Sequence, residues 1–230
     1  MPSSYPAGST DDKGFAIHPG VLASEEVRAL LNGLEEAPIG RSRAGARHLL
    51  GTPAVAAVAR DARLLAIAAR ALGTEAHPFR ATLFTKSPSS NWLVVWHQDT
   101  ALPLRERRDV PGWGPWSLKA GLIYAHAPAE ALSRVVALRV HLDDSTAVNG
   151  PLRVLPGTHR LGVLSDERVH ELAASIAASD CTVPRGGIVA MRPLLVHSSS
   201  KAASTEPRRV VHIEYAASLA LGSQLELCVA

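Results

Sequence analysis

The sequence has little cysteine and no long apolar run, and these two absences exclude several classes of protein. Cys181 and Cys228 are its only cysteines, too few and too far apart for a disulfide framework or a zinc site. Residues 1–13 are polar and lack the apolar core of a signal peptide. No apolar run is long enough to span a bilayer. We therefore expect reduced thiols in a cytoplasmic protein that does not act on membranes.

The sequence also lacks a strong charge of either sign. Its 230 residues carry a net charge of +3, and the basic residues are scattered except around residues 105–108. Nucleic-acid binders usually show a basic stripe with aromatic residues at stacking positions, so we expect no nucleic-acid partner. The chain is 47% hydrophobic and 20% charged, which is ordinary for a globular protein. These features indicate a small-molecule partner and leave the oligomeric state open.

The chain divides into a helical first part and a β-rich remainder. Residues 1–13 are predicted to be a loose tail, and residues 14–230 a single domain. Ser24 is predicted to cap a first helix, whose apolar face is formed by Val27, Leu30, Leu31 and Leu34 at helical spacing. A second helix is predicted to begin at Thr52 and to end at Gly73.

Short runs rich in valine, leucine, isoleucine and aromatic residues follow Gly73, separated by turn residues. Such runs predict strands, here over residues 79–86, 91–98, 135–142, 152–155, 187–191 and 208–216. One further helix is predicted over residues 166–178. Helices followed by many short strands indicate a mainly β fold with flanking α, a jelly-roll barrel buttressed by N-terminal helices.

A candidate metal site is found at the end of the second predicted strand. His97 and Asp99 are two residues apart, so on a strand their side chains point to the same side. His197 lies at the end of a later apolar run, just before a polar loop. Two imidazoles and one carboxylate on one face of an ion are what non-haem Fe(II) oxygenases require.

Two other histidines have the same spacing to an acid, and with ten histidines and 21 acids such coincidences are expected. His141 precedes Asp143 by two residues, and His212 precedes Glu214. Asp143 is better explained by a turn after the strand, and His212 by packing within the last long strand. Context therefore favours His97 and Asp99.

Two consecutive arginines, Arg208 and Arg209, begin that last strand. An arginine that enters a buried strand needs an anionic partner, because an unpaired buried charge is very costly. A dicarboxylic cosubstrate, bound through two hydrogen bonds, would supply one. Adjacent side chains on a strand point to opposite faces, so only one of the two can serve. We expect that one to be Arg208, and Arg209 stays the alternative.

Several of these segments together resemble the phytanoyl-CoA dioxygenase family of Fe(II)/2-oxoglutarate-dependent oxygenases, over roughly residues 14–217. The most specific are the His-Gln-Asp of residues 97–99, the Asn-Gly-Pro-Leu of 149–152 and the Pro-Gly-Thr-His of 156–159, in this order. Phe15-Ala16-Ile17 and Leu142-Asp143-Asp144 add to them. The resemblance implies a double-stranded β-helix, a jelly-roll or cupin-like barrel.

The resemblance also implies a reaction and a set of residues. His97, Asp99 and His197 match the iron ligands, and Arg208 the arginine that binds the distal carboxylate of 2-oxoglutarate. Ser199 matches a hydroxyl that assists this arginine. We further assign Lys86 and Asn91 as cosubstrate contacts. The implied reaction uses Fe(II), 2-oxoglutarate and O2, hydroxylates a C–H bond of a small organic substrate, and releases succinate and CO2.

The substrate is less determined than the reaction. Residues 100–118 form a long segment, which is interpreted either as a lid with Trp113 and Trp116 over the ligand or as a structured surface turn. Lys119, Arg139 and Arg153 are candidate substrate contacts, so an anionic substrate is one option, among acyl-CoA esters, amino acids and secondary metabolites. Because fold does not fix function, a non-catalytic cupin-like binder of a small molecule or metal stays the alternative.

Overall fold

The computed structural model describes residues 10–40, 42 and 45–230, and it shows the predicted mainly β fold with flanking helices. Most of the predicted loose tail, residues 1–9, lies outside the described residues, and its last four residues form helix α1 (Thr10–Lys13). That residues 14–230 form one domain stays a prediction. No helix in the described part of the chain combines the length and apolar character that crossing a membrane requires.

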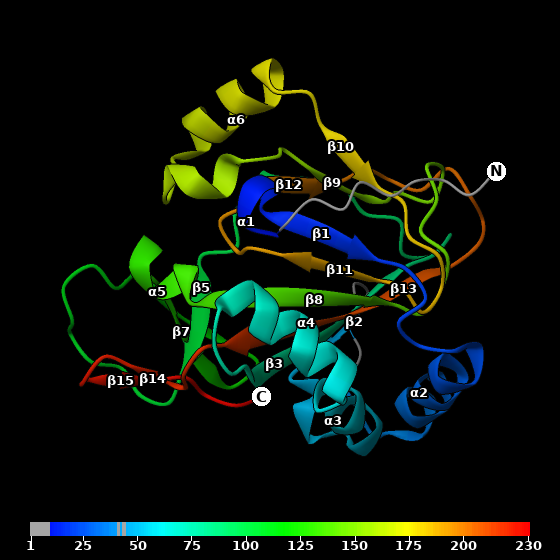
Figure 1. The fold of residues 1–230 in the computed structure, drawn as a ribbon, viewed down its shortest axis with the longest axis horizontal. Coiled ribbons are helices and arrows are strands. Elements are labelled where there is room, and N and C mark those ends of the chain that lie inside the picture. Colours follow the sequence, from blue (N-terminus) through cyan, green and yellow to red (C-terminus); the bar gives the residue numbers. More distant parts are fainter. Residues whose placement is uncertain (1–9, 41, 43–44) are drawn as a thin grey trace.

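The largest element is an antiparallel sheet of six strands (Figure 1). Its centre is formed by its three longest strands. In spatial order its strands are β1 (Phe15–His18), β11 (Ile188–Met191), β8 (Val135–His141), β13 (Arg208–Ala216), β3 (His77–Lys86) and β2 (Gly45–Arg47).

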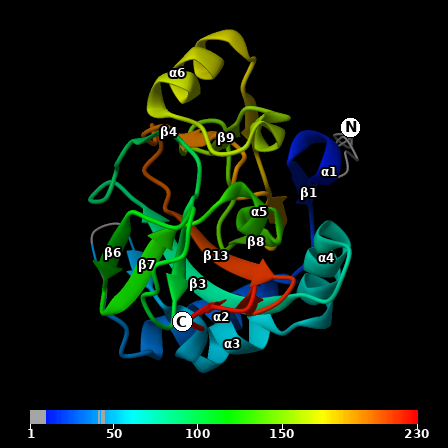
Figure 2. The same ribbon diagram turned by 90° about the vertical axis from the view of Figure 1, so that its left-hand side faces the viewer.

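Three smaller sheets accompany it, all of them antiparallel. The four-stranded sheet lies above the six-stranded one in Figure 2, and no strand pairing joins the two, so they do not close into a barrel. The four strands are β10 (Ser179–Cys181), β9 (Leu152–Val154), β12 (His197–Ser199) and β4 (Val94–His97). The others are β5 (Ala101–Leu104), β7 (Leu122–His126) and β6 (Trp116–Lys119), and the pair β14 (Ala220–Leu221) and β15 (Leu225–Glu226).

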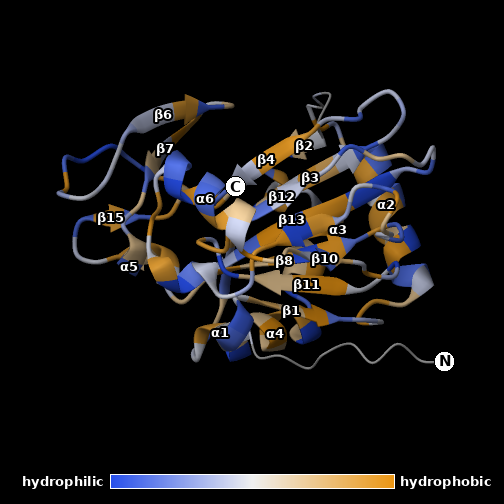
Figure 3. Cartoon of the chain, turned by 90° about the horizontal axis from the view of Figure 1, so that it is seen from above, coloured by the Kyte–Doolittle hydropathy of each residue, from blue (hydrophilic) through white to orange (hydrophobic). Residues whose placement is uncertain are grey.

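Helices cover one face of the six-stranded sheet, and period-two alternation supplies the apolar side chains beneath them. Figure 3 shows apolar stretches along β11 and β13. The helices are α2 (Ser24–Glu36), α3 (Pro53–Ala59) and α4 (Ala62–Leu72). The buried sheet residues of this core are Ala46, Ala81, Leu83, Val136, Leu138, Val140, Ile188, Ala190, Val211, Ile213 and Tyr215.

The predicted helices are confirmed in place but need two corrections. Helix α2 begins at Ser24, so its N-cap is Ala23, whose N–H donates to the Glu26 carboxylate at 2.7 Å. The single helix predicted up to Gly73 is broken, because Asp61 caps a new helix by accepting from the Arg63 N–H at 2.8 Å. Gly73 ends that helix in the left-handed conformation (φ 71°), as expected.

The remaining helices are short or lie outside the sheets. They are α5 (Ala129–Ser133), α6 (Asp166–Ser175) and the 3-10 turns η1 (Leu49–Gly51) and η2 (Thr158–Leu161). Helix α6 is the helix predicted over residues 166–178, and it ends earlier than expected.

The predicted lid over residues 100–118 is wrong in part. Its two ends are strands β5 and β6, which pair with β7 to form the three-stranded sheet. Trp113 and Trp116 pack against an apolar cluster that includes Phe79 and Leu102. The two tryptophans therefore stabilise this sheet and its turn.

Candidate active site

The two histidines of the predicted metal site lie directly opposite each other on neighbouring strands. His97 ends β4 and His197 begins β12, and the antiparallel register pairs these two residues. Their ring centroids are 4.2 Å apart. Asp99 follows β4 after one intervening residue, and one ligand atom from each of the three side chains lies within 4.8 Å of the others. Residues a hundred positions apart thus form one compact group.

Both imidazole rings are held in the orientation that a metal site requires. The Nδ1 atoms of His97 and His197 contact the carbonyl oxygens of Val95 and Leu195, each at 2.8 Å. Such contacts place the proton on Nδ1 and leave the Nε2 lone pair free for a metal. The two Nε2 atoms lie 3.8 Å and 3.6 Å from the carboxylate oxygens of Asp99.

The surroundings favour the protonation states of metal ligands. Burial opposes ionisation of Asp99, but His197, His212, His97 and Arg80 outweigh it and hold the pKa of this carboxyl below its usual range. Burial lowers the pKa of His197 to about 4, although Asp99 acts in the opposite direction. At neutral pH the group therefore offers one carboxylate and a neutral His197, the forms that bind metals.

The residues between the ligands anchor the segments that carry them. The Gln98 side chain donates to the carbonyl oxygens of Gly162 (2.9 Å) and Leu194 (2.7 Å) and accepts from the Leu164 N–H (2.9 Å). This amide thus ties the His97–Asp99 segment to two other loops.

The Pro-Gly-Thr-His segment plays the same part for His197. The Thr158 hydroxyl accepts from the Val196 N–H at 2.9 Å and donates to the Leu155 carbonyl at 2.8 Å. Both bonds are buried, so they fix the backbone immediately before His197.

Arg208 is a buried guanidinium with unused hydrogen-bonding capacity. Its side chain is 4% exposed, its Nε donates to the Asn149 carbonyl at 3.2 Å, and its Nη2 donates to the Ser199 hydroxyl at 3.3 Å. Its Nη1 is buried without a partner among the described residues. Burial, together with Arg139, lowers its pKa to about 9. Such a group calls for an anion.

Arg209 points to the opposite face and already has its anion. Its Nε and Nη2 donate to the Asp143 carboxylate at 2.9 Å and 2.8 Å, and its guanidinium lies 4.0 Å from Glu35. Of the two arginines, Arg208 lines the cavity described below and Arg209 does not.

Lys86 and Ser199 lie beside Arg208. The Lys86 Nζ donates to the Ser199 hydroxyl at 2.8 Å and to the Ser200 carbonyl, and burial lowers the pKa of Lys86 to about 8, with Arg208 and Arg139 adding to the effect. Gly150 permits this packing, because a Cβ there would lie 2.4 Å from the Ser200 carbonyl oxygen and 3.1 Å from the Lys86 Nζ. The Asn-Gly-Pro-Leu segment thus closes one end of the site.

Asn91 does not lie at the cavity. Its side chain donates to the Ala202 carbonyl at 2.8 Å and accepts from the Ala202 N–H at 2.7 Å. It pairs with a loop backbone in both directions, so its assignment as a cosubstrate contact is not supported by its position.

The metal group and Arg208 open onto one cavity of about 350 Å³ between the two larger sheets. This volume is at the small end of the range for ligand pockets. Its lining comprises Arg47, Arg80, Thr82, Phe84, Trp92, Val94, His97, Gln98, Asp99, Thr100, Ala101, Lys119, His126, Arg139, Leu152, His197, Ser198, Ser199, Arg208, His212 and Glu214.

Two of the five predicted substrate contacts, Lys119 and Arg139, line this cavity, and three lie elsewhere. Trp113 and Trp116 belong to the apolar cluster of the three-stranded sheet. Arg153 lies over the Trp96 ring and bonds Asp180 at 3.1 Å. The correction for Arg153 follows from alternation along β9, since the neighbouring Leu152 lines the cavity and Arg153 therefore points to the other face of the sheet.

Sequence reasoning missed several polar side chains of the cavity wall. Arg80 forms an ion pair with Glu214, and His212, whose Nδ1 lies 3.1 Å from Nη1 of the predicted Arg139, lines the cavity as well. A signal for them was present, because polar residues at every second position of an otherwise apolar strand indicate one polar face. Thr82, next to Arg80 on that face, follows the same pattern.

The two rival histidine–acid pairs do not form metal groups. Asp143 bonds Arg209, and Glu214 bonds Arg80, so each acid is occupied. His141 is fully buried, and burial lowers its pKa well below the usual value. Among the described residues, one group of three or more metal-ligating side chains is found, that of His97, Asp99 and His197.

Comparison with known proteins agrees with the site. The model of the phytanoyl-CoA dioxygenase family matches residues 10–210. The chain belongs to this family. The match includes His97, Asp99, His197 and Arg208, so the resemblance seen in the sequence is confirmed.

Individual relatives are distant. An L-proline trans-4-hydroxylase of Streptomyces griseoviridis is 25% identical over 178 residues, which is 66% of this chain. The aligned part spans 59% of that relative's length. AviO1 from Streptomyces viridochromogenes Tue57 is 25% identical, with a TM-score of 0.65 over 90% of this chain and 91% of its own.

Two further solved structures share the fold. EctD from S. alaskensis with bound iron has a TM-score of 0.69 and 23% identity, over 96% of this chain and 78% of its own. HygX from Streptomyces hygroscopicus, with nickel and 2-oxoglutarate bound, has a TM-score of 0.65 and 20% identity, over 90% and 84%. At these identities the likeness concerns the fold, which is the predicted cupin-like jelly roll.

Proposed function

We propose that this protein is an Fe(II)- and 2-oxoglutarate-dependent dioxygenase that hydroxylates a C–H bond of a small organic substrate. One observation carries the proposal. The group formed by His97, Asp99 and His197 and the unpaired guanidinium of Arg208 face the same cavity. A metal site alone would also fit a non-catalytic metal-binding protein. A second site for an anion in the same cavity fits an enzyme that binds an anionic cosubstrate.

The donor set fits iron. Two imidazole nitrogens and one carboxylate oxygen form the facial group that non-haem Fe(II) oxygenases use, with coordination positions left for other ligands. The carbonyl oxygens of Val95 and Leu195 hold the rings, so that both Nε2 atoms point toward Asp99. His97, Asp99 and His197 would therefore hold the ion without rearranging.

The other end of the cavity fits the distal carboxylate of 2-oxoglutarate. Arg208 offers its free Nη1, and the Ser199 hydroxyl lies 3.3 Å from its Nη2. A charge-assisted pair there would satisfy the buried guanidinium. Lys86 adds a second positive charge behind Ser199. Because Lys86 is not part of the cavity lining, it would add positive charge to this end of the cavity without contacting 2-oxoglutarate directly.

Iron and 2-oxoglutarate, when bound, would supply the oxidation of the C–H bond, with release of succinate and CO2. The chain itself holds both in one small cavity, keeps Asp99 ionised, and orients the substrate against bulk water. Asp99 bears on the outcome, because a carboxylate at this position occupies the site that a halide would need. The family relative that hydroxylates L-proline agrees with a small substrate.

The proposal is tested by loading the purified protein with Fe(II) under nitrogen and then measuring succinate release after addition of 2-oxoglutarate and O2. We expect one iron per chain and slow succinate formation that a chelator stops. His197→Ala should lose both, and the matched control His141→Ala should keep both. If iron and 2-oxoglutarate bind but no succinate forms with any small acid, amino acid or acyl-CoA ester, the protein is a non-catalytic member of the family.

A further inference from the structure

The least expected side chain of the cavity is Arg139, which is buried without an acid. It lies on β8, its side chain is 7% exposed, and it lines the cavity. Its Nη1 contacts His212 Nδ1 at 3.1 Å, and its Nε is buried with no partner among the described residues. No carboxylate of the described residues lies within ion-pair distance of it. An arginine in this state needs a counter-charge from outside the chain.

The charges of the whole lining agree with this need. The cavity wall carries five cationic side chains and two carboxylates, an excess of three positive charges. They are Arg47, Arg80, Lys119, Arg139 and Arg208 against Asp99 and Glu214. A divalent metal and a doubly charged cosubstrate cancel each other, so the excess is the same after both are bound. Arg80 is already neutralised by Glu214.

Both charged ends of the cosubstrate would have partners other than Arg139. On β13, Arg208 lies opposite Lys86, whereas Arg139 lies opposite His212, four residues farther along. This offset separates the two backbone positions by about 13 Å along the strand, and the distal carboxylate of 2-oxoglutarate would be taken by Arg208. The other end of the cosubstrate would meet the metal ion, which needs no guanidinium. The partner of Arg139 is therefore a second molecule.

We infer that the substrate of the proposed dioxygenase is a small carboxylic acid, whose carboxylate binds to Arg139 inside the cavity. The inference rests on the proposed function and names its substrate class. The planar guanidinium matches a carboxylate in geometry, and Phe84, whose ring centroid lies 5.5 Å from the Arg139 Cζ, restricts its position. A cavity of about 350 Å³ that must also hold the cosubstrate favours a small acid over an acyl-CoA ester.

Two further cations of the cavity lining, Lys119 and Arg47, would attract such an acid toward the cavity. Lys119 lies on β6, with its Nζ 5.2 Å from the Tyr124 ring centroid, and Arg47 ends β2 with an exposed side chain. Neither forms an ion pair among the described residues. Cations that line a cavity attract anions before they bind. Arg139 is then the specific contact, and Lys119 and Arg47 act on the rate of association.

The test uses pairs of compounds that differ only in the charge. A panel of small carboxylic acids, amino acids included, is compared with the corresponding primary amides for binding to the protein loaded with Ni(II) and 2-oxoglutarate, which prevents turnover. Calorimetry measures the dissociation constants. We expect at least one acid to bind about tenfold or more tighter than its amide. Equal affinities for acids and amides, or no acid bound at all, would overturn the inference.

Variants assign the effect to Arg139. Arg139→Gln should weaken binding of that acid by about tenfold or more and leave its amide unaffected, while metal and 2-oxoglutarate still bind. Arg139→Lys keeps the charge without the planar fork and should give an intermediate loss, which remains measurable if the glutamine variant does not fold. Arg153→Gln is the matched control, since Arg153 lies outside the cavity, and it should bind the acid like the wild type.

The outcomes separate this inference from the proposed function. If Arg139→Gln loses 2-oxoglutarate as strongly as it loses the acid, Arg139 contacts the cosubstrate and the inference is wrong. If the wild type binds no metal or 2-oxoglutarate, the proposed function fails first. If it binds both and releases succinate but does not distinguish acids from amides, the dioxygenase assignment stands and only the substrate class is overturned.

Discussion

The two faces of the six-stranded sheet differ in almost every respect, although the same strands form both. On the helix side, Leu138, Val211 and Tyr215 are fully buried in the main apolar core. On the cavity side, their neighbours Arg139 and His212 carry polar groups that face the candidate metal site. Because side chains alternate along a strand, every second residue serves packing and every other one serves the site.

Arg208 and Arg209 show what this difference teaches. They are identical in type and adjacent in sequence, yet Arg209 bonds Asp143 on one face, whereas on the other the Nη1 of Arg208 is buried with no partner among the described residues. On these strands, the role of a residue therefore depends less on its type than on the face of the sheet to which its side chain points. It also follows that function and stability can be altered separately, by substitutions one position apart.

The largest effect is expected at the metal ligands. Asp99→Ala should abolish tight Fe(II) binding, because it removes the only carboxylate of the group and leaves two imidazoles. Metal content of the purified, reloaded protein measures this directly. The melting temperature should fall little, since the side chain of Asp99 is 33% exposed and outside the apolar core. Loss of iron in His141→Ala but not in Asp99→Ala would mean that the site is elsewhere.

The next effect belongs to the helix side. Leu138→Ala should lower the free energy of unfolding by about 2–5 kcal/mol, because it leaves a cavity in a fully buried core. For a chain of this size the melting temperature should then fall by roughly 5–20 °C. The folded protein should still take up one iron below that temperature. A variant that keeps its stability but loses the metal would contradict the separation of the two faces.

The comparison of the two arginines gives an effect of similar size that is confined to cosubstrate binding. Arg208→Ala should weaken 2-oxoglutarate binding by about 2–5 kcal/mol, because the buried carboxylate loses its charged partner. That is a loss of roughly thirtyfold or more. Arg209→Ala should leave the affinity nearly unchanged and slightly destabilise the fold through Asp143. Calorimetric titration of the metal-loaded variants distinguishes them, and the reverse ranking would move the cosubstrate to the other face.

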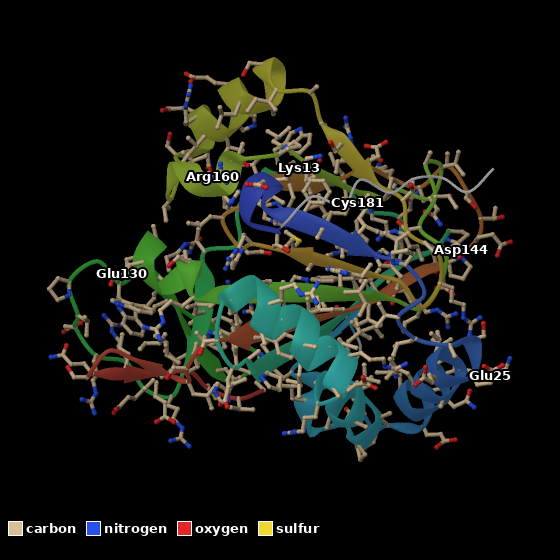
Figure 4. The ribbon with its side chains drawn as sticks, viewed as in Figure 1. Lys13, Glu25, Glu130, Asp144, Arg160 and Cys181 are labelled. Atoms are coloured by element: carbon tan, nitrogen blue, oxygen red, sulfur yellow. The ribbon has the colours of Figure 1, made fainter. Side chains whose placement is uncertain are left out.

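The smallest effect concerns the two thiols. Cys181 is fully buried next to strand β9 and is labelled in Figure 4, and burial raises its pKa to about 12. At pH 8 it should therefore resist alkylation, while the partly exposed Cys228 reacts. Mass spectrometry after brief treatment with iodoacetamide should find one label in the native protein and two in denaturant. Equal labelling of both cysteines in the native state would show that the interior opens.

Much of the fold could be predicted because apolar runs and their period are local signals. Strand β13 has the predicted bounds, residues 208–216, and the six predicted strands all exist. The missed elements carry weak local signals. Strands β5 and β6 are four residues each, and β12 follows an apolar run as the polar segment His-Ser-Ser. The break at Asp61 depends on one capping contact within an otherwise helical pattern.

The residues of the candidate site likewise fall into those that the sequence predicted and those that it did not. His97, Asp99 and His197 could be predicted from spacing, context and resemblance, and the structure brings them together. The contacts of Arg139 with His212, and of Arg80 with Glu214, join strands distant in sequence. They depend on which residues face each other across the sheet. Sequence alone proposed Trp113 for the same cavity because nothing local distinguishes a lid from a packed turn.

The most direct test is a crystal structure of the protein grown under nitrogen with Fe(II) and 2-oxoglutarate, with anomalous data at the iron absorption edge. We expect one anomalous peak, bonded to Nε2 of His97, Nε2 of His197 and the Asp99 carboxylate. The distal carboxylate of 2-oxoglutarate should bond Arg208 and leave Arg139 free. A peak at His141 or His212, or 2-oxoglutarate bound on the face of Arg209, would contradict the assignment of chemistry to the cavity side of the sheet.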